Sequence, residues 1–304
     1  MSASHPQRPL LTRVLSAAVL VPLFLWINAS GGLFFFLAVE VVWLLGARES
    51  ARIFARLGTQ PRVLAALVGT ALLPIFLLDR FAAGAFSPLS AISSGRDDSA
   101  FDAAAVVLPF FAAAFLVVVE SLFSSRARPI SRALAGTFLT MLYPGVLGIF
   151  FFLLRAHEPQ APLYLKPSGA ALTLFLALTT WGCDTFAYFG GRAFGRHKLA
   201  PLISPKKTWE GSLSGFLAAS LLGWISALTY APFWSPLTGL LLGAAMGVGG
   251  QLGDLAESAL KRRASAKDAG AIIPGHGGIL DRFDSFLLNG LILYALVLLL
   301  ERAW

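Results

Sequence analysis

Charged residues are scarce in this sequence: only 13% of its 304 residues are Asp, Glu, Lys or Arg, whereas 57% are hydrophobic. Soluble domains are typically about 45–50% apolar and about 25% charged. The shortage of charge excludes an ordinary soluble protein and indicates a chain that crosses a membrane several times. Because length is a poor guide to domain number in such a chain, we treat residues 1–304 as a single membrane-embedded domain.

Cysteine is nearly absent, since Cys183 is the only one. This excludes an intrachain disulfide and any cysteine metal cluster. Acidic residues are fewer than basic ones, 16 against 24, and the formal net charge is +8. In a chain with many apolar stretches, a basic excess is typical of cytosolic loops that follow the positive-inside rule. We therefore expect no nucleic-acid partner.

Apolar residues form nine stretches, each of which can span a bilayer as a helix when its polar flanks are included. They cover approximately residues 14–28, 32–47, 63–78, 101–119, 133–154, 168–190, 212–231, 237–255 and 286–301. With the N-terminus in the cytosol, the inside segments carry 19 of the 24 Lys and Arg residues and the outside segments carry 5. This distribution predicts an all-α, polytopic helical bundle of about nine transmembrane helices, N-in and C-out.

The two halves of the chain differ in their chemistry. Residues 1–160 have cytosolic loops with arginines and little else, so we expect structural and lipid-facing roles for them. Glu40 stands out there, because a carboxylate at membrane depth is costly and usually faces the bundle interior. Residues 165–304 carry two basic loops on one side of the membrane, 191–211 and 256–285, both rich in glycine and proline. We predict that this half is catalytic.

Glycines recur at four-residue spacing in the eighth stretch, at Gly239, Gly243 and Gly247. Small residues on one helix face let neighbouring backbones approach closely. This pattern predicts tight helix packing at that point of the bundle.

The first loop contains the segment SPKKT at residues 204–208. Ser204 followed by Pro205 is typical of a helix start, with serine as the N-cap and proline at the first helical position. A helix N-terminus has free N–H groups and a positive dipole, and Lys206 and Lys207 would add charges that suit a polyphosphate. The alternative is a basic loop that only faces lipid head groups.

Carboxylates gather around the second loop. We expect Asp254 to close the eighth helix, and Asp281 and Asp284 to share a face where the ninth helix begins. Carboxylates that meet from two helix ends suit a hard cation such as Mg²⁺. The alternative is a capped helix in which Arg282 pairs with the two aspartates. Together with the lysines and arginines of both loops, the carboxylates indicate metal-assisted chemistry on a phosphorylated substrate.

This second loop resembles the signature of phosphatidate cytidylyltransferases, also called CDP-diacylglycerol synthases. The residues that match that signature are Ser258, Lys261, Arg262, Lys267, Asp268, Gly270, Pro274, His276, Gly277, Gly278, Asp281, Arg282 and Asp284. The segment SPKKTWEG is similar to a second stretch of that family. The resemblance covers roughly the last 125 residues of the chain.

The resemblance implies transfer of a cytidylyl group from CTP to phosphatidic acid, which gives CDP-diacylglycerol and pyrophosphate. It implies that Asp254 and Asp281 hold Mg²⁺, with Asp284 or Asp184 as further candidates, and that the lysine-rich loop meets the nucleotide. Asp281, Asp254, Lys206 and Lys207 would then be catalytic. The implied substrate-binding residues are Ser204, Lys206, Lys207, Lys261, Arg262, Lys267, His276, Gly277, Gly278 and Arg282.

Further properties follow from this assignment. We expect a bacterial cytoplasmic (inner) membrane location, contact with membrane lipid and a cytosolic active site. A second, monovalent cation and a homodimer are both compatible with the sequence. The second phosphate pKa of a lipid phosphate is ~6, so this nucleophile is already largely ionised at neutral pH and needs no serine, cysteine or histidine. Metal and basic side chains suffice to relieve repulsion between the two polyanions.

Two alternatives remain open at this point. A CTP-dependent membrane lipid kinase, acting on a polyprenol-type alcohol, would attack the γ-phosphorus and require a general base. A cation- or proton-coupled transporter could use Glu40, Asp184 and Asp254 as a relay. Transport is disfavoured because the chain shows no internal repeat and its charges gather at the cytosolic face instead of the membrane midplane.

Overall fold

The structure is a computed structural model that describes residues 10–78, 98–122, 129–157, 169–273 and 277–303. Helices dominate it. The first half contains α1 (Leu10–Ser30), α2 (Gly32–Arg56), α3 (Val63–Leu72), the 3₁₀ helix η1 (Leu73–Leu77), α6 (Asp98–Leu122), α7 (Ile130–Thr140), the π-helical η2 (Met141–Val146) and α8 (Leu147–Ala156). The second half contains α9 (Gly169–Phe194), β1 (Lys198–Ala200), β2 (Ser204–Thr208), α10 (Trp209–Leu228), α11 (Pro236–Arg263) and α12 (Leu280–Ala303).

Each of the nine apolar stretches coincides with a helix or a continuous helical segment among the described residues. Four of these segments are long and apolar enough, by length and composition, to cross a membrane: Ile130–Ala156, Gly169–Phe194, Trp209–Leu228 and Leu280–Glu301. The chain is therefore a helical membrane protein, as the scarcity of charge predicts.

The α7–η2–α8 segment is one helix with a π-helical turn in its middle. Pro144 lies within that turn. Because proline has no N–H to donate and its ring clashes with the carbonyl four residues earlier, it disrupts regular α-helix hydrogen bonding. The turn widens there and the helix continues beyond it as α8.

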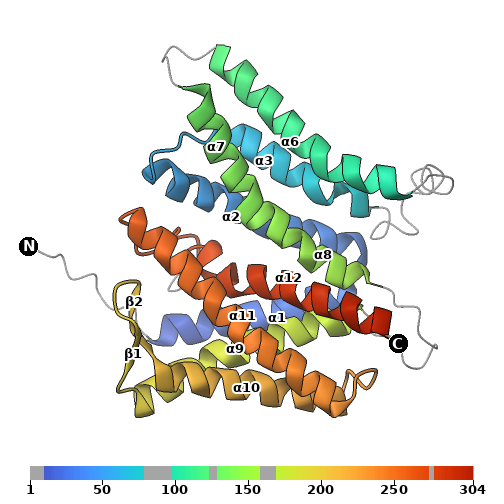
Figure 1. The fold of residues 1–304 in the computed structure, drawn as a ribbon, viewed down its shortest axis with the longest axis vertical. Helices are drawn as coiled ribbons and strands as arrows, with labels where there is room; N and C mark the ends of the chain where they lie inside the picture. Colours follow the sequence, from blue (N-terminus) through green and yellow to red (C-terminus); the bar gives the residue numbers. More distant parts are fainter. Residues whose placement is uncertain (1–9, 79–97, 123–128, 158–168, 274–276, 304) are drawn as a thin grey trace, which may run out of the picture.

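Most helices of the first half lie on one side of α12 and those of the second half on the other, whereas α1 lies on the side of the second half, beside α9 (Figure 1). In that view α3, α6 and α7 lie above, whereas α9, α10 and α11 lie below. The last helix, α12, packs against both α11 and α8, which makes it the link between the halves. The β1–β2 hairpin lies at one end of the bundle and the C-terminal end of α12 at the other.

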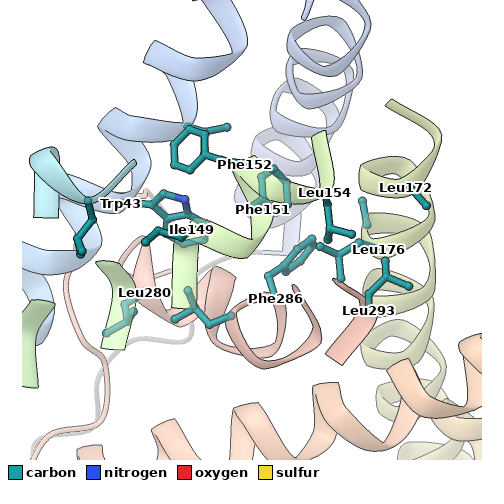
Figure 2. Packing of buried hydrophobic residues seen from close by; sticks show 14 of the residues in the cluster. Trp43, Ile149, Phe151, Phe152, Leu154, Leu172, Leu176, Leu280, Phe286 and Leu293 are labelled. Carbon is teal, nitrogen blue, oxygen red and sulfur yellow. The ribbon is translucent and has the colours of Figure 1, made fainter. Parts of the chain in front are cut away.

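The core lies where α2 and α8 meet α9 and α12 (Figure 2). Trp43 of α2 packs edge-on against Phe283 of α12, with 5.5 Å between ring centroids. Trp181 of α9 packs in the same way against Phe286 of α12, at 5.9 Å. Aromatic pairs of this geometry stabilise a fold beyond the burial of their area. They fix α12, which carries Asp281, in place between the two halves.

The predicted close packing of the eighth stretch is confirmed. A Cβ atom on Gly243 of α11 would collide with the carbonyl oxygen of Ala219 of α10, and one on Gly239 would collide with that of Gly223. Only glycine leaves room for this backbone approach. The two helices are thereby held side by side next to the hairpin that precedes α10.

The predicted helix start at Ser204 is wrong. Ser204 begins strand β2, which pairs antiparallel with β1 in the register Lys198↔Thr208 and Ala200↔Ser204. The fold thus adds a two-stranded sheet to the expected all-α class. Helix α10 begins at Trp209 instead, and its N-cap is Thr208, whose hydroxyl accepts a hydrogen bond from the N–H of Gly211 at 3.2 Å.

The expected position of Asp254 at the end of a helix is also wrong. Helix α11 continues for more than two further turns, to Arg263, and the residues that it buries after Asp254 are the charged Glu257 and Lys261. The connection between α11 and α12 is accordingly shorter than the loop 256–285 expected from the sequence. The connection between α9 and α10 is likewise shorter than 191–211, since α9 ends at Phe194.

Candidate active site

A cavity of about 490 Å³ lies at the hairpin end of the bundle, between α9, β2, α10, α11 and α12. It brings together charged residues from both loops that the sequence singles out. The predicted site residues that line it are Asp184, Lys206, Lys207, Asp254, Lys261, Asp281, Arg282 and Asp284. With Asp268 and Arg192, the lining contains five aspartates and five basic residues. Such a site is suited to anionic phosphates and to a cation that accompanies them.

The β1–β2 hairpin places its two lysines, Lys206 and Lys207, in the lining of this cavity. Nζ of Lys207 lies 2.5 Å from Oδ2 of Asp254 on α11. Arg262, near the end of α11, donates a hydrogen bond from Nε to the carbonyl oxygen of Ile203 in the hairpin turn, at 3.1 Å. Arg262 thus holds the hairpin and does not line the cavity, whereas Lys206 does. The strand, rather than a helix N-terminus, positions the lysine pair.

The base of the hairpin is held by Glu210, in the first turn of α10. Its carboxylate accepts hydrogen bonds from the backbone N–H groups of Arg196 and His197, at 3.1 and 3.2 Å. The His197 ring also contacts it, with Nδ1 2.6 Å from Oε1. The N–H of Trp209 donates back to the carbonyl oxygen of His197 at 2.9 Å. These contacts close the hairpin onto the helix that follows it.

Asp281 occupies the first turn of α12, as predicted, and both of its carboxylate oxygens have partners. Nζ of Lys261 lies 2.6 Å from Oδ1. The N–H of Ala269 donates to Oδ2 at 2.9 Å, and the N–H of Gly278 donates to the same oxygen at 2.8 Å. Asp281 therefore organises the connection between α11 and α12 in addition to facing the cavity.

Polar side chains follow one face at the end of α11, as the three- and four-residue spacing of Asp254, Glu257, Ser258 and Lys261 indicates. Ser258 donates to Oδ1 of Asp254 at 3.2 Å, and Nζ of Lys261 lies 3.0 Å from Glu257. Lys261 is thus held between two carboxylates, those of Glu257 and Asp281. The i,i+4 spacing on a helix produces the first two contacts directly, whereas the third requires α12.

Glu257 and Lys261 lie beyond the apolar stretch 237–255, in the last turns of α11. Burial raises the pKa of Glu257, and the neighbouring carboxyl of Asp284 raises it further. Burial would lower the pKa of Lys261, but the carboxylates of Glu257 and Asp281 outweigh it and raise the pKa above its usual range. Lys261 therefore stays protonated near neutral pH and remains a counter-ion for Asp281.

The donor set of the cavity fits a hard cation. Asp184, Asp254 and Asp284 contribute carboxylate oxygens from three different helices, and oxygen ligands are what Mg²⁺ prefers. In the described part of the chain, no three His, Cys, Asp or Glu side chains already converge tightly enough to hold an ion. Lys207 and Lys261 instead neutralise Asp254 and Asp281 directly.

The remaining predicted residues have other positions. Gly277 adopts a positive φ of 86°, which favours glycine, and leaves room for the Asp281 carboxylate. Gly278 contributes its N–H to Asp281, as above. Ser204 and Lys267 are absent from the lining of this cavity among the described residues. His276 lies outside the described residues.

Sequence reasoning missed several residues that line the cavity. Tyr188 and Arg192 follow Asp184 at helical spacing along one face of α9, so this periodicity could have identified them. Ser212 of α10 and Gln251 of α11 also line it, and the Gln251 amide donates to the carbonyl oxygen of Ser212 at 3.0 Å. Their pairing depends on two packed helices and has no signal in the sequence.

The comparisons with known proteins show the family to which this chain belongs. The model of the "Cytidylyltransferase family" matches residues 11–300, so the chain belongs to the cytidylyltransferase family. Its relatives include a phosphatidate cytidylyltransferase from Synechocystis sp., which is 33% identical over 95% of this chain and 96% of its own length. The phosphatidate cytidylyltransferase of Brucella abortus is 34% identical over 93% of this chain and 91% of its own. That of Staphylococcus epidermidis is 40% identical over a shorter region, 49% of this chain and 53% of its own.

Proposed function

We propose that this protein transfers the cytidylyl group of CTP to phosphatidic acid and releases pyrophosphate. One observation carries the proposal: in a chain of this family, the cavity brings the lysine pair of the hairpin against the aspartates of α11 and α12. Lysines and carboxylates massed at one end of a membrane bundle suit the transfer of a phosphoryl-linked group between two polyanions.

The reaction forms one bond and breaks one bond. A phosphate oxygen of phosphatidic acid attacks the α-phosphorus of CTP, the bond between the α-phosphorus and the bridging oxygen breaks, and pyrophosphate leaves with that oxygen. The second phosphate pKa is ~6, so the attacking oxygen is already largely deprotonated near neutral pH. No side chain has to remove a proton.

The basic residues of the cavity neutralise the negative charge of the two substrates, which the reaction brings close together. Lys206 and Lys207 of β2 lie where they can bind the triphosphate, and Arg282 of α12 adds a further cation to the cavity lining. These cations relieve repulsion between the lipid phosphate and CTP, and they stabilise the departing pyrophosphate. The hairpin contacts of Glu210 and Arg262 keep the two lysines oriented.

Asp254 and Asp281 would hold Mg²⁺, with Asp284 and Asp184 as the neighbouring carboxylates. When bound, this ion would neutralise phosphate oxygens and polarise the phosphorus that is attacked. Asp254 and Asp281 are held in place beforehand by Lys207 and Lys261, which neutralise the two carboxylates.

A cytosolic site follows from the same proposal. With nine spans, N-in and C-out, the hairpin end of the bundle faces the cytosol of a bacterium, where CTP is available. Phosphatidic acid would enter from the cytoplasmic membrane in which the helices lie. This orientation is supported by the excess of Lys and Arg in the segments at that end.

The test follows the label of CTP into lipid. Purified protein is incubated with phosphatidic acid, Mg²⁺ and CTP labelled at either the α- or the γ-phosphorus, and the lipid is extracted. We expect label in lipid from the α-position only. Lipid label from the γ-position would support a lipid kinase instead, and no lipid label from either position would refute the proposal. Diacylglycerol in place of phosphatidic acid is the matched control acceptor.

A further inference from the structure

A buried carboxylate from the first half of the chain contacts the connection between α11 and α12, next to the candidate active site. Glu49 lies near the end of α2, and its side chain is completely buried. Its Oε2 accepts a hydrogen bond from the backbone N–H of Leu280, the first residue of α12, at 2.9 Å. The two residues are 231 positions apart in sequence. Helix α2 thus supplies an acceptor for one of the N–H groups that a helix N-terminus leaves without an intrahelical partner.

Two glycines of the connection between α11 and α12 make room for this carboxylate. A Cβ atom on Gly270 would collide with Oε1 of Glu49, and one on Gly278 would collide with both of its carboxylate oxygens. Neither glycine has a positive φ, so backbone conformation does not require glycine at either position. Their common property is that Glu49 occupies the space where a side chain would be.

Glu49 and Asp281 bind the same short stretch of backbone. The N–H of Gly278 donates to Asp281, whereas the N–H of Leu280, two residues later, donates to Glu49. The positive end of the α12 dipole stabilises both carboxylates. Because Glu49 fixes the peptide groups that orient Asp281, displacement of Glu49 would change where the Asp281 oxygens point.

A purely structural role for Glu49 explains this arrangement less well than a role in orienting Asp281. Oε1 of Glu49 is buried and has no hydrogen-bond partner among the described residues. Burial of a carboxylate with an unpartnered oxygen costs free energy that an apolar side chain at the same position would not incur. The acceptor oxygen that binds the N–H of Leu280 is the one feature of Glu49 that an apolar side chain could not provide.

We propose that Glu49 is a positioning residue for the cytidylyl transfer, acting through the backbone of residues 278–280 on Asp281. The inference rests on the proposed function, because it takes Asp281 as part of the reacting site. It assigns the first half of the chain a role in catalysis. Helix α2 holds the start of α12 in the geometry that the cavity needs.

The test compares four single variants and one double variant by kcat, KM for CTP and the Mg²⁺ concentration at half-maximal rate. Glu49→Ala should lower kcat by about 10- to 100-fold and raise the Mg²⁺ requirement, as loss of a residue that orients a metal-binding side chain does. KM for CTP should change by less than about threefold, because Lys206 and Lys207 are untouched. Glu49→Gln keeps an acceptor oxygen and should retain kcat within about threefold of wild type.

Gly270→Ala tests the contact from the other side. Its Cβ displaces the carboxylate, so this variant should reproduce the kinetic pattern of Glu49→Ala. The double variant Glu49→Ala/Gly270→Ala should be no worse than either single one, since residues that act through one contact are not additive. Glu40→Ala removes a partly buried carboxylate elsewhere on the same helix and should keep wild-type kinetics.

Three outcomes would overturn the inference: wild-type kinetics in Glu49→Ala, equal damage in Glu49→Gln, or the same loss in Glu40→Ala. Thermal unfolding in detergent shows whether each variant is folded. If Glu49→Ala is unfolded, the inference is judged on Glu49→Gln and Gly270→Ala, and wild-type kinetics in Gly270→Ala overturns it. A wild-type protein that transfers no label refutes the proposed function itself, whereas active wild type with unaffected variants refutes only the role of Glu49.

Discussion

Lys207 of β2 and Asp254 of α11 form an ion pair in which Nζ lies 2.5 Å from Oδ2. Their side chains are 25% and 30% exposed, so the pair is partly shielded from water. It joins the first of the two basic loops to the helix that precedes the second, and it places a cation and a carboxylate in the lining of one cavity. Breaking a partly buried pair by removal of one partner leaves the other charge uncompensated, which is the costly case.

The lysine pair should determine the efficiency with CTP. We expect Lys206→Ala or Lys207→Ala to lower kcat/KM for CTP by about 10- to 10³-fold, equivalent to ~1.4–4 kcal/mol of lost transition-state binding. The matched control is Lys198→Ala, because Lys198 lies on β1 of the same hairpin, is exposed and is not among the cavity-lining residues. Wild-type kinetics in a Lys206→Ala/Lys207→Ala double variant would contradict this prediction. The basic residues of the loop would then serve only to set the orientation of the protein in the membrane.

The aspartates should determine the dependence on Mg²⁺. Asparagine keeps the shape of the side chain and one oxygen ligand but removes the charge. We expect Asp254→Asn and Asp281→Asn to lower the rate by about 10²-fold or more, and Asp284→Asn to have a smaller effect. The measurement is cytidylyl transfer against Mg²⁺ concentration, with CTP in fixed excess.

A second readout of the same variants does not depend on activity. Mg²⁺ should raise the Tm of wild-type protein in a concentration-dependent way, because a ligand that binds the folded state stabilises it. This rise should be lost in Asp254→Asn. Glu301→Gln is the control, since Glu301 lies at the far end of α12 and pairs with His157 at 2.7 Å. If both aspartate variants kept the metal dependence of wild type, Asp184 would become the next candidate.

The orientation in the membrane can be tested with single cysteines. Leu202, in the hairpin turn, is 93% exposed, and Thr229 is exposed at the opposite end of α10. An impermeant thiol reagent should label Thr229→Cys in sealed cells and Leu202→Cys only after membrane disruption. The parent protein gives the background, because its Cys183 is buried. Labelling of Leu202→Cys in sealed cells would place the cavity on the wrong side for CTP.

The glycine contact between α10 and α11 should matter for stability. Gly243→Ala forces the two backbones apart and should lower the free energy of unfolding by about 1–3 kcal/mol. Gly290→Ala in α12 is the matched control, because the nearest atom to its new Cβ, from Phe150, would be at 3.6 Å, an ordinary contact. The control should be neutral or slightly stabilising, since alanine favours a helix over glycine. Equal Tm values for the two variants in detergent would contradict the predicted role.

Most of the secondary structure could be predicted from the sequence, since nine apolar stretches coincide with nine helical segments among the described residues. The polar face of α11 could also be predicted, because the spacing of Asp254, Ser258 and Lys261 places them on one side of any helix. The hairpin could not be predicted. SPKKT satisfies the local rules for a helix start, and only pairing with β1 makes Ser204–Thr208 a strand.

The sequence by itself determined which residues carry the chemistry, since lysines, arginines and aspartates in two basic loops are sufficient to indicate phosphate and cation binding. Tertiary structure alone decided which of them meet. Lys207 reaches Asp254 through strand pairing, and Lys261 reaches Asp281 because α12 returns beside α11. Glu49 reaches Leu280 across the whole chain. Local propensity acts over a few neighbouring residues, whereas these contacts depend on the packing of helices that the sequence separates by tens to hundreds of positions.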